Sequence, residues 1–187
     1  MTSHAVIRSS LMAALLLVAP AMPSATAWAQ TATPDRPDVI YVPTPAAVVD
    51  AMLQLAKVTS ADVVYDLGCG DGRIPVTAAK RFGARGVCID IDPERIREAD
   101  ENIARSGVGD KVRTVQGDLF QQPLGDATVV TLYLLDSINE RLLPKLRREL
   151  KPGTRIVSHA FRMGAWAPEQ TLTIDGRRIF FWTIPPR

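Results

Sequence analysis

The fold is decided by residues 63–73, which read VVYDLGCGDGR. An apolar run ends in an acid, and glycines follow at positions 68, 70 and 72. Glycine adopts backbone angles closed to other residues and, because it lacks a Cβ, lets the main chain approach a ligand closely. The stretch therefore predicts a buried strand and a glycine turn that cradles a nucleotide. A tight strand-to-helix connection without a ligand is the alternative.

Composition and charge limit the classes of protein that fit. The chain has 187 residues, of which 47% are hydrophobic and 22% are charged. These values suit one globular domain with a substantial core. The 22 basic and 20 acidic side chains give a formal net charge of +2, which is too balanced for a protein that binds through phosphate attraction. We therefore expect no nucleic-acid partner.

The first 29 residues differ in kind from the rest. Arg8 precedes the apolar stretch 11–18, prolines follow at 20 and 23, and residues 27–29 read AWA. This order resembles a secretory signal peptide cleaved before Gln30, and its apolar stretch is too short to favour a permanent membrane span. We predict a signal peptide over 1–29, an extended linker over 30–43 and a domain over 44–187. The predicted location is the bacterial periplasm, with membrane association through an uncleaved segment as the alternative.

The two cysteines, Cys69 and Cys88, are too few for a small fold held together by several disulfides. Cys69 lies in the glycine turn and Cys88 lies within the next predicted strand. One bridge is conceivable in an oxidising compartment, but a small buried thiol is the commoner role of cysteine at such positions. We therefore expect no disulfide.

Short apolar runs alternate with amphipathic segments from residue 63 onward, which is the pattern of a doubly wound α/β sheet. This alternation predicts strands over 63–67, 86–91, 112–116, 127–132 and 155–161. The segments 171–174 and 179–184 then flank Asp175-Gly176, the signature of a tight β-hairpin. The predicted fold is a Rossmann-like, mainly parallel seven-stranded sheet that ends in an antiparallel hairpin.

Helices are predicted between these strands, over 74–82, 93–106 and much of 137–150. Pro144 falls inside the last of them, which suggests a separate first turn. Thr44 and Pro45 form a cap and first-turn pair that begins another helix, at the entrance to the domain.

Ligands of an open α/β sheet bind beyond the carboxyl ends of the strands, where the strand order reverses. This rule brings the glycine turn, Asp90, Asp118 and Tyr133 to one crevice. Asp90 follows Gly70 by 20 residues, a spacing at which a carboxylate accepts both hydroxyls of a ribose. The neighbouring acid at 92 is better explained as the cap of the next helix.

The glycine turn departs from the dinucleotide fingerprint G-x-G-x-x-G. That fingerprint needs a small residue where Arg73 stands. The turn thus fits a loop around an amino-acid tail better than a helix end that receives a pyrophosphate. Asp118 can accept from an adenine amino group while Leu119 packs on the ring, and a plain turn acid is the equal alternative.

Three motifs in this order resemble those of class I S-adenosylmethionine-dependent methyltransferases. They are DLGCGDG at 66–72, Asp90 after the second strand, and Gly117-Asp118 after the third. The resemblance covers about residues 41–185 and implies the class I methyltransferase fold with S-adenosylmethionine as cofactor. It implies cofactor contacts from Tyr41, Asp66, Gly68, Cys69, Gly70, Asp90, Ile91, Asp118 and Leu119.

A narrower resemblance rests on YVPTP at 41–45, GRI at 72–74 and TLYLL at 131–135. These motifs are similar to those of the protein-lysine methyltransferases that act on the mitochondrial adenine nucleotide translocase and the ATP synthase c subunit, and of their bacterial relatives. The resemblance implies a protein acceptor with an exposed lysine, in solution or at a membrane. A small-molecule acceptor, a non-catalytic nucleoside-binding module and a nicotinamide-dependent reductase are the rival hypotheses.

Two residues are candidates for the acceptor side of the reaction. Tyr133 ends the fourth strand, where it can line the acceptor channel, and His159 ends the fifth, where it can act as a general base. An aromatic at the sheet edge and a satisfied structural histidine are the alternatives. Methyl transfer from a sulfonium needs alignment of the reacting atoms more than a metal, so we expect no metal site.

Overall fold

The structure is a computed structural model that describes Met1 and residues 41–187. The predicted signal peptide and most of the predicted linker lie outside these residues. The described residues form seven strands and four helices, and none of these helices is long and apolar enough to cross a membrane. The strands are β1 (Val63–Leu67), β2 (Arg85–Asp90), β3 (Val112–Gln116), β4 (Val129–Leu132), β5 (Arg155–His159), β6 (Gln170–Ile174) and β7 (Arg177–Thr183). The helices are α1 (Ala46–Leu55), α2 (Arg73–Phe82), α3 (Pro93–Ser106) and α4 (Asp136–Glu149).

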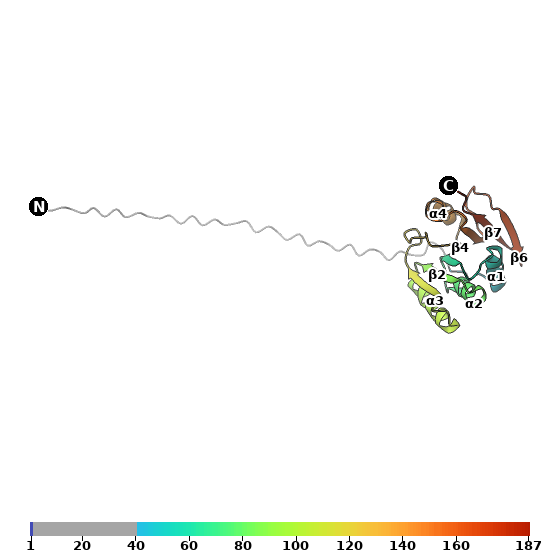
Figure 1. Ribbon diagram of the computed structural model, residues 1–187, viewed down its shortest axis with the longest axis horizontal. Coiled ribbons are helices and arrows are strands. Elements are labelled where there is room, and N and C mark those ends of the chain that lie inside the picture. Colours follow the sequence, from blue (N-terminus) through green and yellow to red (C-terminus); the bar gives the residue numbers. More distant parts are fainter. Residues whose placement is uncertain (2–40) are drawn as a thin grey trace. The chain divides into compact units, whose positions relative to one another are not determined.

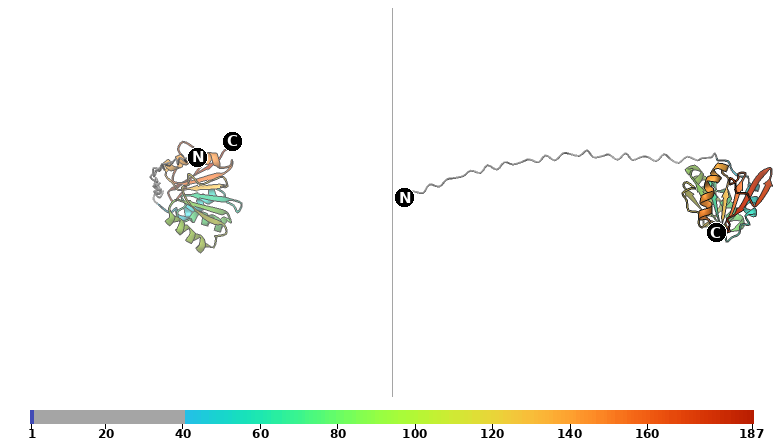
Figure 2. Two further views of the ribbon diagram at one scale, coloured as in Figure 1. Left: turned by 90° about the vertical axis from the view of Figure 1, so that its left-hand side faces the viewer. Right: turned by 90° about the horizontal axis from the view of Figure 1, so that it is seen from above.

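The strands form one sheet in the order β3-β2-β1-β4-β5-β7-β6, and Figure 2 shows them side by side. Strands β1 to β5 are parallel, whereas β7 runs antiparallel to both β5 and β6. The chain moves outward from β1 to β3 and then returns to the other side of β1 with β4. This reversal creates a crevice at the carboxyl ends of β1 and β4, where open α/β sheets bind ligands.

Helices cover both faces of the sheet. Helices α1, α2 and α3 lie together, and α4 lies apart from them across the sheet (Figure 1). Successive side chains of a strand point to opposite faces. In β1, Val64 therefore packs with α1 and α2, while Tyr65 and Leu67 pack with α4. The two apolar cores occupy the faces of the sheet and leave the strand ends to polar residues.

The structure confirms the predicted fold class. The sheet is mainly parallel and ends in the expected hairpin, whose turn residues Asp175 and Gly176 have φ angles of 49° and 75°. Positive φ at both positions matches the twist of the flanking strands. The predicted cap of α3 is also present, because Asp92 accepts a hydrogen bond from the Glu94 amide at 2.8 Å.

Some local predictions were wrong. Strand β5 ends at His159 instead of 161, because Ala160 has a left-handed φ of 65° that turns the chain away from the sheet. Helix α4 runs unbroken through Pro144, with Leu142 and Leu146 fully buried on either side of it. Thr44 does not cap α1, since its hydroxyl is hydrogen bonded to His159 instead.

Candidate active site

A pocket lies at the carboxyl ends of β1 to β4, the edge at which sheets of this kind bind small molecules. The residues at its wall come from the ends of these strands and the turns after them, from the first turns of α2, α3 and α4, and from the segment that precedes α1. Nearly all the predicted site residues line it, namely Tyr41, Asp66, Gly68, Cys69, Asp90, Ile91, Asp118, Leu119 and Tyr133. Gly70 and His159 do not line the pocket and lie directly behind its wall.

The glycine turn between β1 and α2 needs its glycines. Gly68, Gly70 and Gly72 have φ angles of +75°, +54° and +71°, a region that favours glycine. A Cβ on Gly70 would lie 2.2 Å from a ring carbon of Tyr41. Gly70 therefore supports the wall beneath Tyr41, and this is why it is absent from the pocket surface.

Asp90 connects the turn to the end of β2. One oxygen of its carboxylate accepts a hydrogen bond from the Gly70 amide at 2.8 Å, and the other accepts from the Asp92 amide at 3.0 Å. Each carboxylate oxygen can accept a further bond, and Asp90 faces the pocket. The residue can therefore hold the turn and bind ligand hydroxyls at the same time.

Asp66 is the most deeply buried acid of the site, with 3% of its surface exposed. Thr131 is its Cα partner on β4, and the Thr131 hydroxyl donates to the Asp66 carboxylate at 2.7 Å. Burial raises the pKa of Asp66 to about 7, an effect that Thr131 opposes and that the charges of Asp90 and Asp71 reinforce. A cationic ligand placed here would favour the ionised form.

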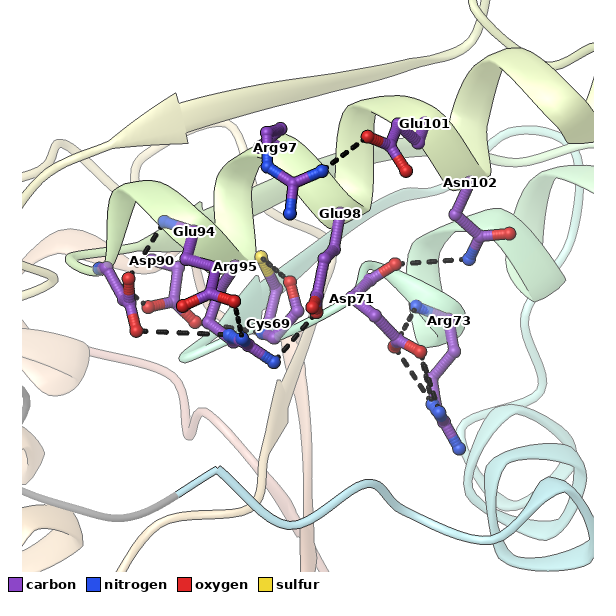
Figure 3. Close-up of polar contacts among 12 residues, drawn as sticks. Cys69, Asp71, Arg73, Asp90, Glu94, Arg95, Arg97, Glu98, Glu101 and Asn102 are labelled. Atoms are coloured by element: carbon purple, nitrogen blue, oxygen red, sulfur yellow. Dashed lines mark hydrogen bonds and ion pairs between the residues drawn. The ribbon is translucent and has the colours of Figure 1, made fainter.

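Asp71 and Arg73 form an ion pair at the pocket wall, and the sequence did not predict either residue as part of the site. The Arg73 guanidinium donates to both oxygens of Asp71, at 2.9 and 2.6 Å, and also to the Thr44 carbonyl at 2.9 Å. Burial raises the pKa of Asp71, but the hydrogen bonds and charge of Arg73 outweigh it and leave that pKa below its usual value. Arg73 thus ties the segment before α1 to the glycine turn, and Figure 3 shows its ion pair with Asp71.

Arg95 is a second residue that sequence reasoning missed. It lies in α3 with its guanidinium 4.7 Å from the centre of the Tyr41 ring, in a cation–π contact. It is also paired with Glu98 at 2.7 Å (Figure 3). The sequence gives no sign of this contact, because Arg95 reaches Tyr41 only when α3 packs beside the glycine turn.

Asp118 is a turn acid that also lines the pocket, and its contact with adenine stays a prediction. Its carboxylate accepts from the Phe120 amide at 2.9 Å, as a turn acid does, and it also lines the pocket. The preceding Gly117 donates its amide to the Asp90 carbonyl at 2.9 Å. The turn after β3 is therefore fastened to the end of β2, which places Asp118 and Leu119 at the same edge of the pocket as Asp90.

The opposite end of the pocket carries Tyr133 and Thr44. The Tyr133 ring lies against the His159 ring with centroids 3.9 Å apart, and the Thr44 hydroxyl lies 3.3 Å from His159 Nδ1. His159 is only 1% exposed. Burial, with a smaller contribution from Arg177, lowers its pKa to about 4. The His159 ring thus lies behind Tyr133 and does not line the pocket, and its role as a general base stays a prediction.

The expectation of free cysteines was also wrong. Cys69 and Cys88 form a disulfide, with their Cα atoms 5.3 Å apart. The sequence placed one cysteine in the turn after β1 and the other in β2, but it did not reveal that the turn folds back over β2. This return is what brings the two sulfurs together.

The charge of the pocket restricts its ligand. Two arginines and five aspartates line it, namely Arg73, Arg95, Asp66, Asp71, Asp90, Asp92 and Asp118. This excess of acid disfavours a dinucleotide, whose pyrophosphate is anionic, and favours a ligand with cationic groups. S-adenosylmethionine carries a sulfonium and an amine beside its ribose and adenine, so the carboxylates and the glycine turn fit it.

Comparisons with known proteins agree with this chemistry. The chain matches the family of ANTKMT methyltransferase domains over residues 66–170. Over 140 residues it is 51% identical to a protein of Saccharolobus islandicus named protein-lysine N-methyltransferase, covering 74% of this chain and 87% of that one. Over 152 residues it is 32% identical to the adenine nucleotide translocase lysine N-methyltransferase of Mus musculus, covering 81% of this chain and 66% of the relative.

One similar protein of known structure contains the demethylated cofactor. It is a protein of Salinibacter ruber, described as an RNA methyltransferase in complex with S-adenosyl-L-homocysteine, and it superimposes with a TM-score of 0.77 at 53% sequence identity. The match covers 78% of this chain and 95% of that protein. The family match spans more than half of the chain, and the relative of known structure binds the demethylated cofactor. The chain therefore belongs to the ANTKMT methyltransferase family and is an S-adenosylmethionine-dependent methyltransferase.

Proposed function

We propose that the protein methylates the side-chain amine of lysine in a protein acceptor. The observation that carries this proposal is its 51% identity to a relative named protein-lysine N-methyltransferase, 87% of whose length it covers. The pocket supports the same conclusion. Among the described residues, the connections after β1 and β4 are short and span 68–72 and 133–135. A large acceptor can therefore reach the pocket mouth.

The charge of the pocket also favours a lysine acceptor. The excess of aspartates over arginines at the wall attracts a cationic amine and raises its local concentration. The amine must then become neutral before it can attack. Tyr133, Leu134 and Ile138 line the pocket, and we assign them to the acceptor side, where their apolar surfaces would disfavour the charged amine and lower its pKa.

The mechanism relies on positioning. The bound cofactor supplies a methyl group that its sulfonium activates for transfer. Asp66 and Asp90 would hold polar groups of the cofactor, and the Tyr133 ring would form the wall along which the amine approaches. His159 fixes that ring by stacking against it at 3.9 Å. Alignment of the reacting atoms is the main source of rate in such a displacement.

RNA is the second candidate acceptor, because the 53%-identical protein of Salinibacter ruber is described as an RNA methyltransferase. Two features disfavour RNA for this chain. Its net charge of +2 is nearly balanced, and acids dominate the pocket wall. Proteins that bind nucleic acid present clustered basic residues to the phosphates.

We further propose that the protein acts outside the cytosol. The signal-like pattern of residues 1–29 supports export, and so does the Cys69–Cys88 disulfide, since such bonds persist in oxidising compartments. Cell fractionation with sequencing of the mature N-terminus tests this proposal. We expect a periplasmic protein that begins at Gln30, and a cytosolic protein that retains Met1 would contradict it.

The acceptor is tested with S-adenosylmethionine that carries a labelled methyl group. Purified protein is incubated separately with soluble protein, membrane protein and RNA, and the modified residue is identified by mass spectrometry. We expect label on lysine in a protein fraction and none with the Asp90→Ala variant. Label in RNA would establish the second candidate, and label confined to small molecules would contradict both.

A further inference from the structure

The disulfide lies within the cofactor site. Cys69 occupies the middle of the glycine turn and lines the pocket, with 5% of its surface exposed, and Cys88 is fully buried in β2. The bond therefore joins a wall of the pocket to the strand that carries Asp90 two residues later. A disulfide that served the fold alone would not need to pass through this turn.

Three further hydrogen bonds of the turn end on the same part of β2, while the Asp71 carbonyl accepts from Asn102 of α3 at 3.1 Å. The amides of Gly68 and Cys69 both donate to the Ile89 carbonyl, at 2.9 and 3.1 Å, and the Gly70 amide donates to Asp90. The turn is rich in glycine, which loses more conformational freedom on ordering than any other residue. A covalent link at its centre reduces the number of alternative conformations that compete with the one that faces the pocket.

The surroundings leave the turn little freedom while the bond is present. Cys69, Cys88 and Ala99 form a small buried cluster between the turn and α3, and Figure 3 shows Cys69 beside α3 with Asp90 and Asp71 on either side. A Cβ on Gly72 would lie 3.1 Å from the Ala99 Cβ and 3.5 Å from the Cys88 sulfur. The disulfide therefore fills the space beneath the turn.

We infer that Cys69 and Cys88 are positioning residues for the cofactor, and that their disulfide holds the glycine turn in the conformation that binds S-adenosylmethionine. The inference rests on the cofactor assignment and adds to it a dependence on redox state. Reduction by a dithiol transfers two electrons and two protons to the bond and leaves two thiols and a cyclic disulfide product. The released turn must then be reordered by the ligand, so the cofactor binds more weakly.

Binding and reduction must be coupled in both directions. If reduction weakens cofactor binding by a given factor, then bound cofactor opposes reduction by the same factor. We expect a factor of about ten, within the usual range of such couplings. For this two-electron couple, a tenfold change corresponds to a shift of about 30 mV in midpoint potential. A merely structural disulfide would show no such shift.

The test measures binding of S-adenosylhomocysteine by calorimetry to the oxidised protein and to protein reduced with dithiothreitol, with thiols counted in each sample. We expect about tenfold weaker binding after reduction, and a midpoint potential about 30 mV more negative when the ligand is present. Equal dissociation constants for the two forms would overturn the inference. Absence of binding in both forms would overturn the cofactor assignment itself.

Two variants serve as controls. Cys88→Ala, which removes a sulfur that does not line the pocket, should bind like the reduced protein whether or not reductant is present. The double variant Cys69→Ser/Cys88→Ala should behave in the same way and excludes effects of a remaining thiol. Melting temperatures are recorded for every sample. If reduction lowers the melting temperature and leaves affinity unchanged, the bond is structural only and the inference fails.

Discussion

The acidic end of the pocket, which we assign to the cofactor, centres on the glycine turn and the adjacent strand, whereas the aromatic end, which we assign to the acceptor, is assembled from three distant segments. Residues 66–72 supply the glycine turn, and Asp90 lies on the adjacent strand. At the acceptor end, Thr44 precedes α1, Tyr133 follows β4 and His159 ends β5. One end is acidic and hydrogen bonded through main-chain amides. The other is aromatic and contains a neutral histidine.

This difference suggests that cofactor binding depends on one end of the pocket and turnover on the other. Substitutions at the acidic end should change the affinity for cofactor, because they alter the groups that face it. Substitutions at the aromatic end should change turnover, because they alter how the acceptor approaches. Single substitutions should therefore separate the two effects.

Asp90→Ala should have the largest effect. It removes hydrogen bonds to the Gly70 and Asp92 amides as well as the predicted contact to the cofactor ribose. Loss of charge-assisted bonds of this kind costs about 1.5–3 kcal/mol each, so affinity for S-adenosylhomocysteine should fall by about 100-fold or more. Calorimetry measures the change, with the exposed Asp110→Ala as a matched control. Unchanged affinity would remove the basis of the cofactor site.

Tyr133→Ala should reduce turnover and leave cofactor affinity nearly unchanged. Without the ring, the acceptor amine loses the wall that aligns it, and misplacement of this kind costs about tenfold to 100-fold in kcat. Steady-state kinetics and calorimetry separate the two quantities. Tyr133→Phe keeps the ring and its contact with His159, so it should retain most of the activity. Equal losses in both variants would show instead that the hydroxyl takes part in the reaction.

Cofactor affinity should depend on pH through Asp66. Its pKa of about 7 means that the carboxyl is largely protonated at pH 6 and largely ionised at pH 8. A cationic ligand prefers the ionised form, so affinity should fall by about tenfold between pH 8 and pH 6. Binding should release a proton over this range, which calorimetry in buffers of different ionisation enthalpy detects. Asp66→Asn should bind weakly at every pH, and a sloping profile in that variant would assign the titration elsewhere.

Thr131→Val should weaken cofactor binding by about fivefold, the effect of one lost hydrogen bond. The change removes the hydroxyl that donates to Asp66 at 2.7 Å while conserving the shape of the side chain. Because that bond lowers the pKa of Asp66, its loss should also move the pH profile of binding to higher pH. Thr131→Ser restores the donor and should restore both affinity and profile. A shift that serine fails to reverse would point to packing.

His159→Leu should have the smallest effect, about threefold or less in kcat, with cofactor affinity unchanged. The ring acts through its contacts with Tyr133 and Thr44, and the neutral form persists because its pKa is lowered to about 4. Rate profiles between pH 5 and pH 8 should therefore show no ionisation that disappears in the variant. A loss of more than about 100-fold in kcat would instead support His159 as the general base.

The same contrast between local and distant residues explains which features the sequence predicts. The strands, the hairpin turn and the glycine turn follow from local patterns, and the spacing from Gly70 to Asp90 follows from one strand-helix-strand unit. Arg73, Arg95 and the disulfide were missed. Each depends on which surfaces come together after the turn folds back over β2 and α3 packs beside it.

The amino-acid sequence alone determined the class of fold, the position of the pocket and the family, because glycine turns, strand periodicity and acids at strand ends are local properties of the chain. Only the tertiary structure decided that Cys69 is bonded to Cys88 and that His159 is neutral and hidden behind Tyr133. Both outcomes depend on burial and on contacts between segments far apart in the chain. Such quantities are set by the packed molecule and have no counterpart in any short stretch of residues.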